Sequence, residues 1–148
     1  RAKYQGRHAA LGWLGARMAD AWTTGAGTGH AAPEVVTWVP AAPVRRRARG
    51  VDHARVLAVG VAARLDLPAV PLLVRRDRET QTQRPIADRR RGPHVEARRP
   101  ARGTVLLVDD VATTGATLRV CATALRGAGA GAVVGLTAAR TPDGRVRG

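Results

Sequence analysis

Aromatic residues are nearly missing from this chain of 148 residues: they make up 3% of it, and phenylalanine is absent. Any core must therefore be aliphatic and depend on close approach of small residues. A single cysteine excludes an internal disulfide and a cysteine-based zinc site within this chain. No run of eighteen apolar residues and no signal-peptide pattern is present, so we expect a soluble, cytoplasmic protein without a membrane span. Because the first residue is Arg1 rather than methionine, we also expect that an amino-terminal segment is missing.

Acidic residues are also few, 11 against 25 lysines and arginines, which gives a net charge of +14. Such a balance is typical of proteins that bind polyphosphates or nucleic acids. An arginine-rich coding bias that only decorates the surface would give the same composition. The arginines concentrate at residues 45–49, 75–78, 84–91 and 98–102, where the sequence has loop character, and this favours anion binding slightly.

The most informative stretch covers residues 105–117, Val-Leu-Leu-Val-Asp-Asp-Val-Ala-Thr-Thr-Gly-Ala-Thr. Its four leading apolar residues predict a strand buried on both faces. The carboxylates Asp109 and Asp110 follow at the end of that strand. A turn of small and hydroxyl-bearing residues around Gly115 comes next, and apolar residues then recur at helical spacing.

Each part of this stretch suits one part of a sugar phosphate. A turn that enters a helix points free N–H groups at one spot, which favours a phosphate. Gly115 allows a close backbone approach or a positive φ angle. Asp109 and Asp110 repel a phosphate but can accept hydrogen bonds from the two hydroxyls of a ribose. A strand, a turn and a capped helix without any ligand remain the alternative, which either half alone would favour, whereas the whole run favours a ligand site.

The run closely resembles the phosphoribosyl pyrophosphate (PRPP) signature of type I phosphoribosyltransferases. The resemblance implies that Asp109 and Asp110 contact the ribose 2′- and 3′-hydroxyls. It also implies that the 5′-phosphate is held by the loop that follows, namely Ala112, Thr113, Thr114, Gly115, Ala116 and Thr117. A Walker A loop is a poor alternative because no Gly-Lys-Ser/Thr is present.

The rest of the chain alternates between helix and strand patterns. Apolar periodicity predicts helices at residues 8–22, 51–65 and 116–127, and strands at 35–39, 70–74, 105–108 and 132–138. We expect loops at 23–29 and 40–50, a polar insert of little regular structure at 75–102, and a frayed tail from 142. This order predicts an α/β fold with a parallel sheet flanked by helices, and ligands that bind at the carboxyl ends of its strands.

Further motifs narrow the resemblance to the ComF family of predicted phosphoribosyltransferases. They are Val39-Pro-Ala-Ala-Pro43, Arg49-Gly50, Asp52-His53, the segment 75–83, and Lys3 with Gly6-Arg7. The resemblance covers nearly the whole chain and implies a single phosphoribosyltransferase-like domain over residues 1–148, with a hood insert. The family's amino-terminal, cysteine-rich zinc-binding segment is absent here. The Arg-x-x-Asn of its insert is matched only by Arg91-Gly-Pro-His94.

The resemblance also implies two further parts of the site. The loop after residues 35–39 would bind pyrophosphate through Pro40, Ala41, Ala42, Pro43 and Arg49. The hood would cover the substrate and contribute Arg75, Arg78, Thr80 and Gln83. No catalytic residue is assigned. Asp52 is expected to cap a helix, a role that we prefer to catalysis by the adjacent His53, and Cys121 is expected to be packed rather than reactive.

The function that follows is transfer of phosphoribosyl from PRPP to an unknown acceptor, with release of pyrophosphate and with Mg²⁺ bound through PRPP rather than by protein ligands alone. Two alternatives remain open. One is PRPP binding without turnover. The other is an accessory module in natural competence and DNA uptake that touches single-stranded DNA or a helicase, although so few aromatic residues give weak support for base stacking. A homodimer is compatible with the sequence.

Overall fold

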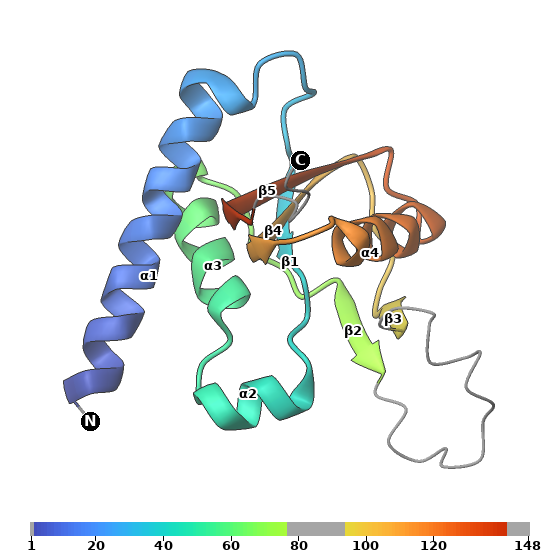
Figure 1. Cartoon of the computed structure of the whole chain (residues 1–148). Coiled ribbons are helices and arrows are strands. Elements are labelled where there is room, and N and C mark those ends of the chain that lie inside the picture. Colours follow the sequence, from blue (N-terminus) through green and yellow to red (C-terminus); the bar gives the residue numbers. More distant parts are fainter. Residues whose placement is uncertain (1, 77–93, 142–148) are drawn as a thin grey trace, which may run out of the picture.

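The structure is a computed structural model that describes residues 2–76 and 94–141 (Figure 1). Its elements are α1 (Ala2–Ala21), the π-helical turn η1 (Trp22–Ala26), β1 (Val35–Trp38), α2 (Pro43–Arg49), α3 (His53–Leu65), β2 (Leu73–Arg76), β3 (His94–Ala97), β4 (Thr104–Ala112), α4 (Ala116–Gly127) and β5 (Ala132–Arg140).

Within the described residues, three strands form a parallel sheet in the order β1-β4-β5. The central strand β4 pairs with β1 only as far as Trp38↔Val108, but it pairs with β5 as far as Ala112↔Arg140. The carboxyl end of β4 therefore extends past β1 and leaves an open edge on that side. The α/β fold with a parallel sheet flanked by helices, predicted from the alternating pattern, is confirmed.

Helices cover both faces of this sheet (Figure 1). Leu106 and Val108 of β4 face α1 and α3, whereas Val105 and Leu107 face the side of α4, as the two-residue period of a strand requires. All four side chains are at most 1% exposed, which explains their uninterrupted apolar run. The core is aliphatic, as the composition demands; among the described residues, Trp22 is its one buried aromatic side chain, and it is 8% exposed.

Glycine brings α1 and α3 into close contact. A Cβ atom on Gly15 would lie 2.5 Å from the backbone oxygen of Leu57, and one on Gly60 would lie 2.7 Å from the oxygen of Gly12. Neither position can therefore hold a side chain without a backbone shift. Close approach of small residues replaces here the bulky aromatic packing that the sequence lacks.

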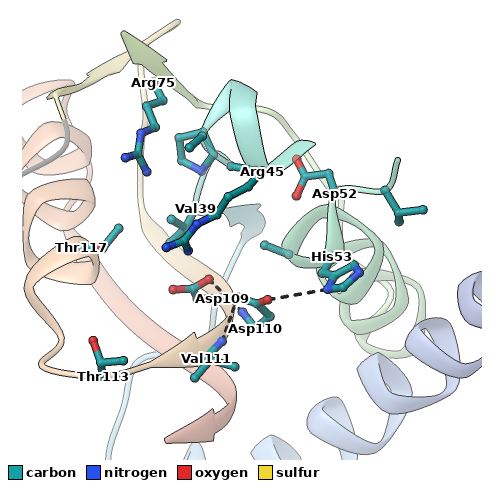
Figure 2. Close-up of a pocket in the computed structure, with 15 residues that line it drawn as sticks. Val39, Arg45, Asp52, His53, Arg75, Asp109, Asp110, Val111, Thr113 and Thr117 are labelled. Carbon is teal, nitrogen blue, oxygen red and sulfur yellow. Dashed lines mark hydrogen bonds and ion pairs between the residues drawn. The ribbon is translucent and has the colours of Figure 1, made fainter. Parts of the chain in front are cut away.

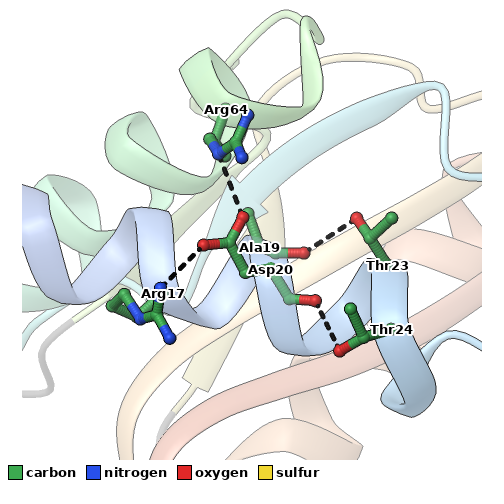
Figure 3. Close-up of polar contacts among 6 residues, drawn as sticks. All are labelled: Arg17, Ala19, Asp20, Thr23, Thr24 and Arg64. Atoms are coloured by element: carbon green, nitrogen blue, oxygen red, sulfur yellow. Dashed lines mark hydrogen bonds and ion pairs between the residues drawn. The ribbon is translucent and has the colours of Figure 1, made fainter.

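Polar contacts hold the carboxyl end of α1 against α3 (Figure 3). Asp20 accepts hydrogen bonds from Arg64 Nε on α3 at 3.0 Å and from Arg17 Nη1 at 3.2 Å. The hydroxyls of Thr23 and Thr24 donate to the backbone oxygens of residues 19 and 20 at 3.0 and 2.9 Å. These contacts are exposed or half-buried, so they add little free energy, but they fix where α1 gives way to η1.

A second, antiparallel pair of strands lies apart from the main sheet. β2 pairs with β3 from Leu73↔Ala97 to Arg76↔His94. Glu96 accepts a hydrogen bond from Arg76 Nε at 3.2 Å, and its other oxygen lies 2.8 Å from His94 Nε2, which together lower the pKa of Glu96. The predicted hood residues Arg78, Thr80 and Gln83 lie outside the described residues.

Several predicted boundaries were wrong. α1 begins at Ala2 rather than at residue 8, and the expected loop at 23–29 begins with η1. The expected loop at 40–50 contains α2, because proline is tolerated at the first position of a helix and the arginines and alanine that follow are good helix formers. β4 and β5 are also longer than predicted, because β4 continues through the acidic pair to Ala112 and β5 continues to Arg140.

The predicted strand at 70–74 is shifted and belongs to the second, antiparallel pair of strands. Residues 68–70 make only an isolated parallel bridge to the main sheet at Val36↔Ala69, and β2 starts at Leu73. The insert at 75–102 is not structureless throughout, because it contains β3. The predictions for α3 and α4 are confirmed, and Asp52 caps α3 by accepting a hydrogen bond from Arg55 N at 3.2 Å.

Candidate functional site

A cleft lies at the carboxyl edge of the parallel sheet, where β4 extends past β1 (Figure 2). Its volume is about 240 Å³. The lining residues come from the loop after β1, from α2, from the start of α3, from β2 and β4, and from the turn into α4 and its first residues: Val39, Pro40, Ala41, Ala42, Arg45, Val51, Asp52, His53, Ala54, Arg75, Asp109, Asp110, Val111, Thr113 and Thr117. The loops after β1 and β4 therefore face one site, as the sequence pattern predicts for parallel strands.

The acidic pair lies on the part of β4 that has no partner in β1. Asp109 is 9% exposed, and its Oδ1 accepts a hydrogen bond from Asp110 N at 2.8 Å. Asp110 is half-buried, and its Oδ1 accepts from Val111 N at 2.9 Å. Burial, together with the neighbouring Asp110 carboxylate, raises the pKa of Asp109 to about 7.

The turn into α4 is shaped to receive an anion. Gly115 precedes the helix with φ +77°, a left-handed conformation that glycine adopts without strain. Thr114 Oγ1 accepts from Ala116 N at 3.3 Å, and Arg119 Nη1 donates to Thr114 O at 3.3 Å. Thr114 thus uses its hydroxyl within the turn, whereas Thr113 and Thr117 line the cleft. First-turn N–H groups of α4 and the helix dipole add positive potential here.

Basic side chains approach the acidic pair from the side that lies across the cleft from the turn into α4. Arg45 on α2 and Arg75 on β2 both point into the cleft (Figure 2). The neighbouring Arg76 has the other orientation on β2 and contacts Glu96 instead. Sequence reasoning selected Arg49 for this loop, but the structure does not describe the Arg49 side chain, and it is Arg45 that lines the cleft. Had residues 43–49 been predicted as a helix, Arg45 could have been selected, because it lies in the first turn of α2.

His53 is a cleft residue that the sequence prediction did not select. It is the first residue of α3, and its Nδ1 lies 3.8 Å from Asp110 Oδ2 (Figure 2). The predicted capping role of Asp52 is confirmed, but the next residue turns its imidazole to the acidic pair. The contact becomes an ion pair when the imidazole is protonated.

The structure brings together most of the predicted site residues that it describes. Asp109, Asp110, Thr113, Thr117, Pro40, Ala41, Ala42 and Arg75 line the cleft. Ala112, Thr114, Gly115 and Ala116 belong to the end of β4 and the turn, and Pro43 begins α2. Cys121 is fully buried on α4, and burial raises the pKa of its thiol to about 12, so it is packed rather than reactive, as predicted.

The described residues contain no group of three or more His, Cys, Asp or Glu side chains that could hold a metal ion. A divalent cation in this cleft would have to share its coordination between one or two carboxylates and oxygens of a ligand, which is the usual arrangement for Mg²⁺ beside phosphates. Over residues 2–76 and 94–141, no helix is both long and apolar enough to cross a membrane.

Comparison with known proteins gives a consistent result. The family model "Phosphoribosyl transferase domain" matches residues 52–146, which include the cap of α3 and the whole acidic pair and turn. A solved structure of glutamine phosphoribosylpyrophosphate (PRPP) amidotransferase from B. subtilis, complexed with ADP and GMP, is 28% identical with a TM-score of 0.62. The alignment covers 88% of this chain and 26% of that one.

A solved structure of the allosteric regulatory enzyme of purine biosynthesis is also 28% identical, with a TM-score of 0.59 and the same coverage of 88% and 26%. The chain thus spans about a quarter of the length of these two proteins. No curated protein sequence matches it. The parallel sheet carries the acidic pair directly before the turn into α4, and the chain has the type I phosphoribosyltransferase fold. Because the family model covers well over half of the chain, this chain belongs to the phosphoribosyl transferase domain family.

Proposed function

We propose that the chain binds PRPP in the cleft and transfers its phosphoribosyl group to an acceptor, with release of pyrophosphate. One observation carries the proposal: the acidic pair of β4 stands between an anion-binding turn on one side and inward-pointing arginines on the other. PRPP has this order of chemistry, a 5′-phosphate, a ribose with free hydroxyls and a diphosphate. Membership in a family that uses PRPP supports the assignment.

Each part of the cleft has a role in this proposal. Asp109 and Asp110 accept hydrogen bonds from the ribose hydroxyls. Thr113, Thr117 and the backbone of residues 112–117 hold the 5′-phosphate at the amino end of α4. The diphosphate lies toward the loop at residues 40–43 and the guanidinium of Arg45, which points into the cleft. Arg49 stays a predicted pyrophosphate contact, because the structure does not describe its side chain.

The chemistry is a substitution at C1 of the ribose. The bond between C1 and the diphosphate oxygen breaks, and its electron pair leaves with pyrophosphate. The acceptor atom supplies the electron pair of the new bond and releases its proton to solvent. Positive charge that develops on the ribose is stabilised by the Asp110 carboxylate, and negative charge on the departing diphosphate by Arg45 and Arg75.

Mg²⁺ fits this site only as a cation whose coordination is shared between the carboxylates of the cleft and the oxygens of PRPP. The cleft offers the carboxylates Asp109 and Asp110, which suit a hard cation, but they form no closed set of protein ligands among the described residues. When bound with PRPP, Mg²⁺ would neutralise charge on the diphosphate. The residues of this chain would orient the ribose and exclude water around it.

The similarity to ComF leads to a finer proposal, that of a ComF-like protein with one domain over residues 1–148 and a role in competence or DNA uptake. The motif around Asp52-His53 supports it, because both residues line the cleft beside the loop at residues 40–43. PRPP binding without turnover is the main alternative, since none of the described side chains that line the cleft is assigned as a general base for an acceptor. Contact with single-stranded DNA is a further alternative that the net charge of +14 keeps open.

The experiment measures PRPP binding and pyrophosphate release by the whole chain with Mg²⁺. Calorimetry on the parent, on Asp110→Asn and on the distant control Asp20→Asn tests the site, since Asp20 lies at the α1–α3 contact. We expect the parent and Asp20→Asn to bind alike and Asp110→Asn to bind more weakly. Absence of PRPP binding by the parent would overturn the proposal, and binding without pyrophosphate release for any acceptor would favour the non-catalytic alternative. A salt series on single-stranded DNA tests the last alternative.

A further inference from the structure

A second groove lies at the end of the molecule opposite the cleft. Its walls come from η1 and the loop that follows it, from the residues just before β1, and from Leu65 and Leu67 around the carboxyl end of α3. Figure 1 shows η1 at the far end of β1 from α2. The volume of the groove is about 420 Å³, which lies within the range of about 300–1,000 Å³ that small-molecule sites occupy. Among the described residues, the groove and the cleft share no lining residue, so the two are separate.

The edge of a buried indole opens into this groove. Trp22 is 8% exposed, and the described part of the chain provides no hydrogen-bond partner for its Nε1. Because no described side-chain nitrogen or oxygen is both buried and without a partner, this N–H must reach solvent. Trp22 lines the groove, so we place the N–H there. An indole N–H can only donate a hydrogen bond, so a ligand beside it has to present an acceptor.

Gly27 keeps the indole N–H uncovered. The π-helical hydrogen bond from Gly27 N to Trp22 O, at 2.8 Å, folds Gly27 onto Trp22. A Cβ atom on Gly27 would lie 2.9 Å from Nε1 and 2.7 Å from Cε2 of the indole. The φ angle of Gly27 is −81°, which any residue adopts, so the indole rather than the backbone conformation requires glycine here. Turns of π-helix are rare and occur frequently at functional sites.

The walls of the groove have no fixed charge. Lysine, arginine, aspartate and glutamate make up 24% of the chain, and the cleft collects both signs of charge, but none of these residues lines the groove in the described ranges. His30 lines it and stacks on Trp22, with ring centroids 5.8 Å apart. Leu65 and Leu67 pack partly on the core and add apolar surface. Such walls favour an uncharged ligand, because a charged one would lose its hydration without gaining a partner.

We propose that this groove is a second ligand site, and that it binds a small, flat, uncharged ring compound that carries a hydrogen-bond acceptor such as a carbonyl oxygen. The acceptor receives the N–H of Trp22 beside Gly27. The ring lies between His30 and the two leucines at the end of α3. This site goes beyond the proposed function and does not depend on it, since PRPP binds at the other end of β1.

Three matched probes test the chemistry of the site. Acetophenone has a ring and a carbonyl oxygen, ethylbenzene has the same skeleton without the oxygen, and benzoate has the ring with a negative charge. We would titrate each into the full chain and follow the indole N–H signals by NMR. The chain has three tryptophans, so Trp13→Phe and Trp38→Phe identify the signal of Trp22 by elimination.

Acetophenone should move the Trp22 signal downfield in a saturable manner. Ethylbenzene should bind about fivefold more weakly, which is the ratio that a neutral hydrogen bond of about 1 kcal/mol confers. Benzoate should bind more weakly than acetophenone, because no cationic side chain of the described residues lines the groove. Equal binding of acetophenone and ethylbenzene would overturn the inference.

Two pairs of variants locate the binding. Gly27→Ala covers the indole N–H and should reduce the affinity for acetophenone to that for ethylbenzene. Gly25→Ala in the same turn is its control, since a Cβ there meets nothing within 4 Å, and it should bind as the parent does. Thr28→Arg changes an exposed residue that lines the groove and should weaken acetophenone about tenfold. Its control is Thr24→Arg, because Thr24 is exposed on η1 outside the groove.

Other outcomes also decide the inference. Binding that neither Gly27→Ala nor Thr28→Arg weakens would overturn it. Displacement of acetophenone by PRPP would place the probe in the cleft, and a Trp22 signal that changes when the protein alone is diluted would assign the groove to a second copy of the chain. Either result would overturn it. Failure of the parent to bind PRPP would overturn the proposed function only, because the probe titrations are made without PRPP.

Discussion

The two ends of α3 meet very different surroundings. Toward its carboxyl end, Gly60 packs against α1 so closely that an added Cβ would lie 2.7 Å from the oxygen of Gly12. At its amino end, Asp52 and His53 line a cleft with the acidic pair and inward-pointing arginines. The contact of Gly60 with α1 leaves no room for a side chain, whereas the cleft brings charged side chains together at the open edge of the sheet.

This contrast separates stability from ligand binding. The α1–α3 contact is remote from the cleft and contains apolar side chains and glycines, so changes there should alter the free energy of unfolding alone. Most polar side chains of the cleft lie outside the buried core, so changes to them should alter PRPP binding. The exception is Asp109, which is buried at the boundary between the two and should affect both.

The largest expected effect is therefore on the pH dependence of the free energy of unfolding, which Asp109 controls. Because burial raises its pKa in the folded protein to about 7, stability that is fully present below the ordinary pKa of an aspartate is lost as pH rises through about 7. Asp109→Asn removes this loss, so the variant should gain stability over the parent by on the order of 3 kcal/mol between pH 4 and pH 8. Urea unfolding at both pH values measures the gain. A difference between variant and parent that is the same at pH 4 and pH 8 would contradict the burial argument.

Asp110→Asn should weaken PRPP binding by about 1.5–3 kcal/mol, the usual contribution of a hydrogen bond to a charged group. Its unfolding free energy should change little, because this side chain is half-buried at the cleft and lies outside the core. Calorimetry with Mg²⁺ and chemical unfolding on the same preparation measure the two quantities. A loss of stability as large as the loss of affinity would remove the distinction between the regions.

Gly15→Ala should destabilise the fold by about 1–3 kcal/mol, because its Cβ would lie 2.5 Å from the oxygen of Leu57. Gly12→Ala is the matched control on the same helix, since a Cβ there meets nothing within 4 Å, and it should stabilise by about 0.4–1 kcal/mol. Thermal unfolding of both variants gives the comparison. Similar effects of the two substitutions would show that the helix contact is looser than the structure indicates.

The smallest effect concerns the hydroxyls of the turn. Thr117→Val and Thr114→Val should each weaken PRPP by about 0.5–1.5 kcal/mol. The causes differ, because Thr117 lines the cleft whereas Thr114 holds the turn through Ala116 N. Only Thr114→Val should therefore also lower stability measurably. PRPP titrations of both variants, combined with thermal melts, test this, and unchanged affinity in both would place the phosphate elsewhere.

Much of the site was predictable because its signals are local. The strand, the acidic pair, the turn at Gly115 and the helix α4 follow each other within one continuous stretch, and α4 has the bounds that its apolar spacing predicts. The parts that were missed depend on distant partners. β2 pairs with β3 across an insert without periodicity, so its place in the antiparallel pair rather than in the main sheet has no local signal. Helix α2 was also missed, because Pro43 and the arginines after it were interpreted as a loop, and Arg45 was therefore not selected.

The position of His53 in the cleft also depends on a residue that is distant in the sequence. Its contact with Asp110 joins residues that are 57 positions apart, and it depends on the open edge left by β4. A sequence pattern identifies Asp52 as a cap but does not tell where the next side chain points. Tertiary placement therefore decides that the imidazole of His53, and not only the carboxylate of Asp52, faces the cleft.

The most direct test of the account is a crystal structure of the chain with PRPP and Mg²⁺. We predict the 5′-phosphate at the turn of residues 113–117 and the ribose hydroxyls within hydrogen-bond distance of Asp109 and Asp110. The diphosphate should lie toward the loop at residues 40–43 and Arg45. PRPP bound away from the acidic pair, or absent at concentrations that saturate binding in solution, would contradict the central claim that this cleft is a PRPP site.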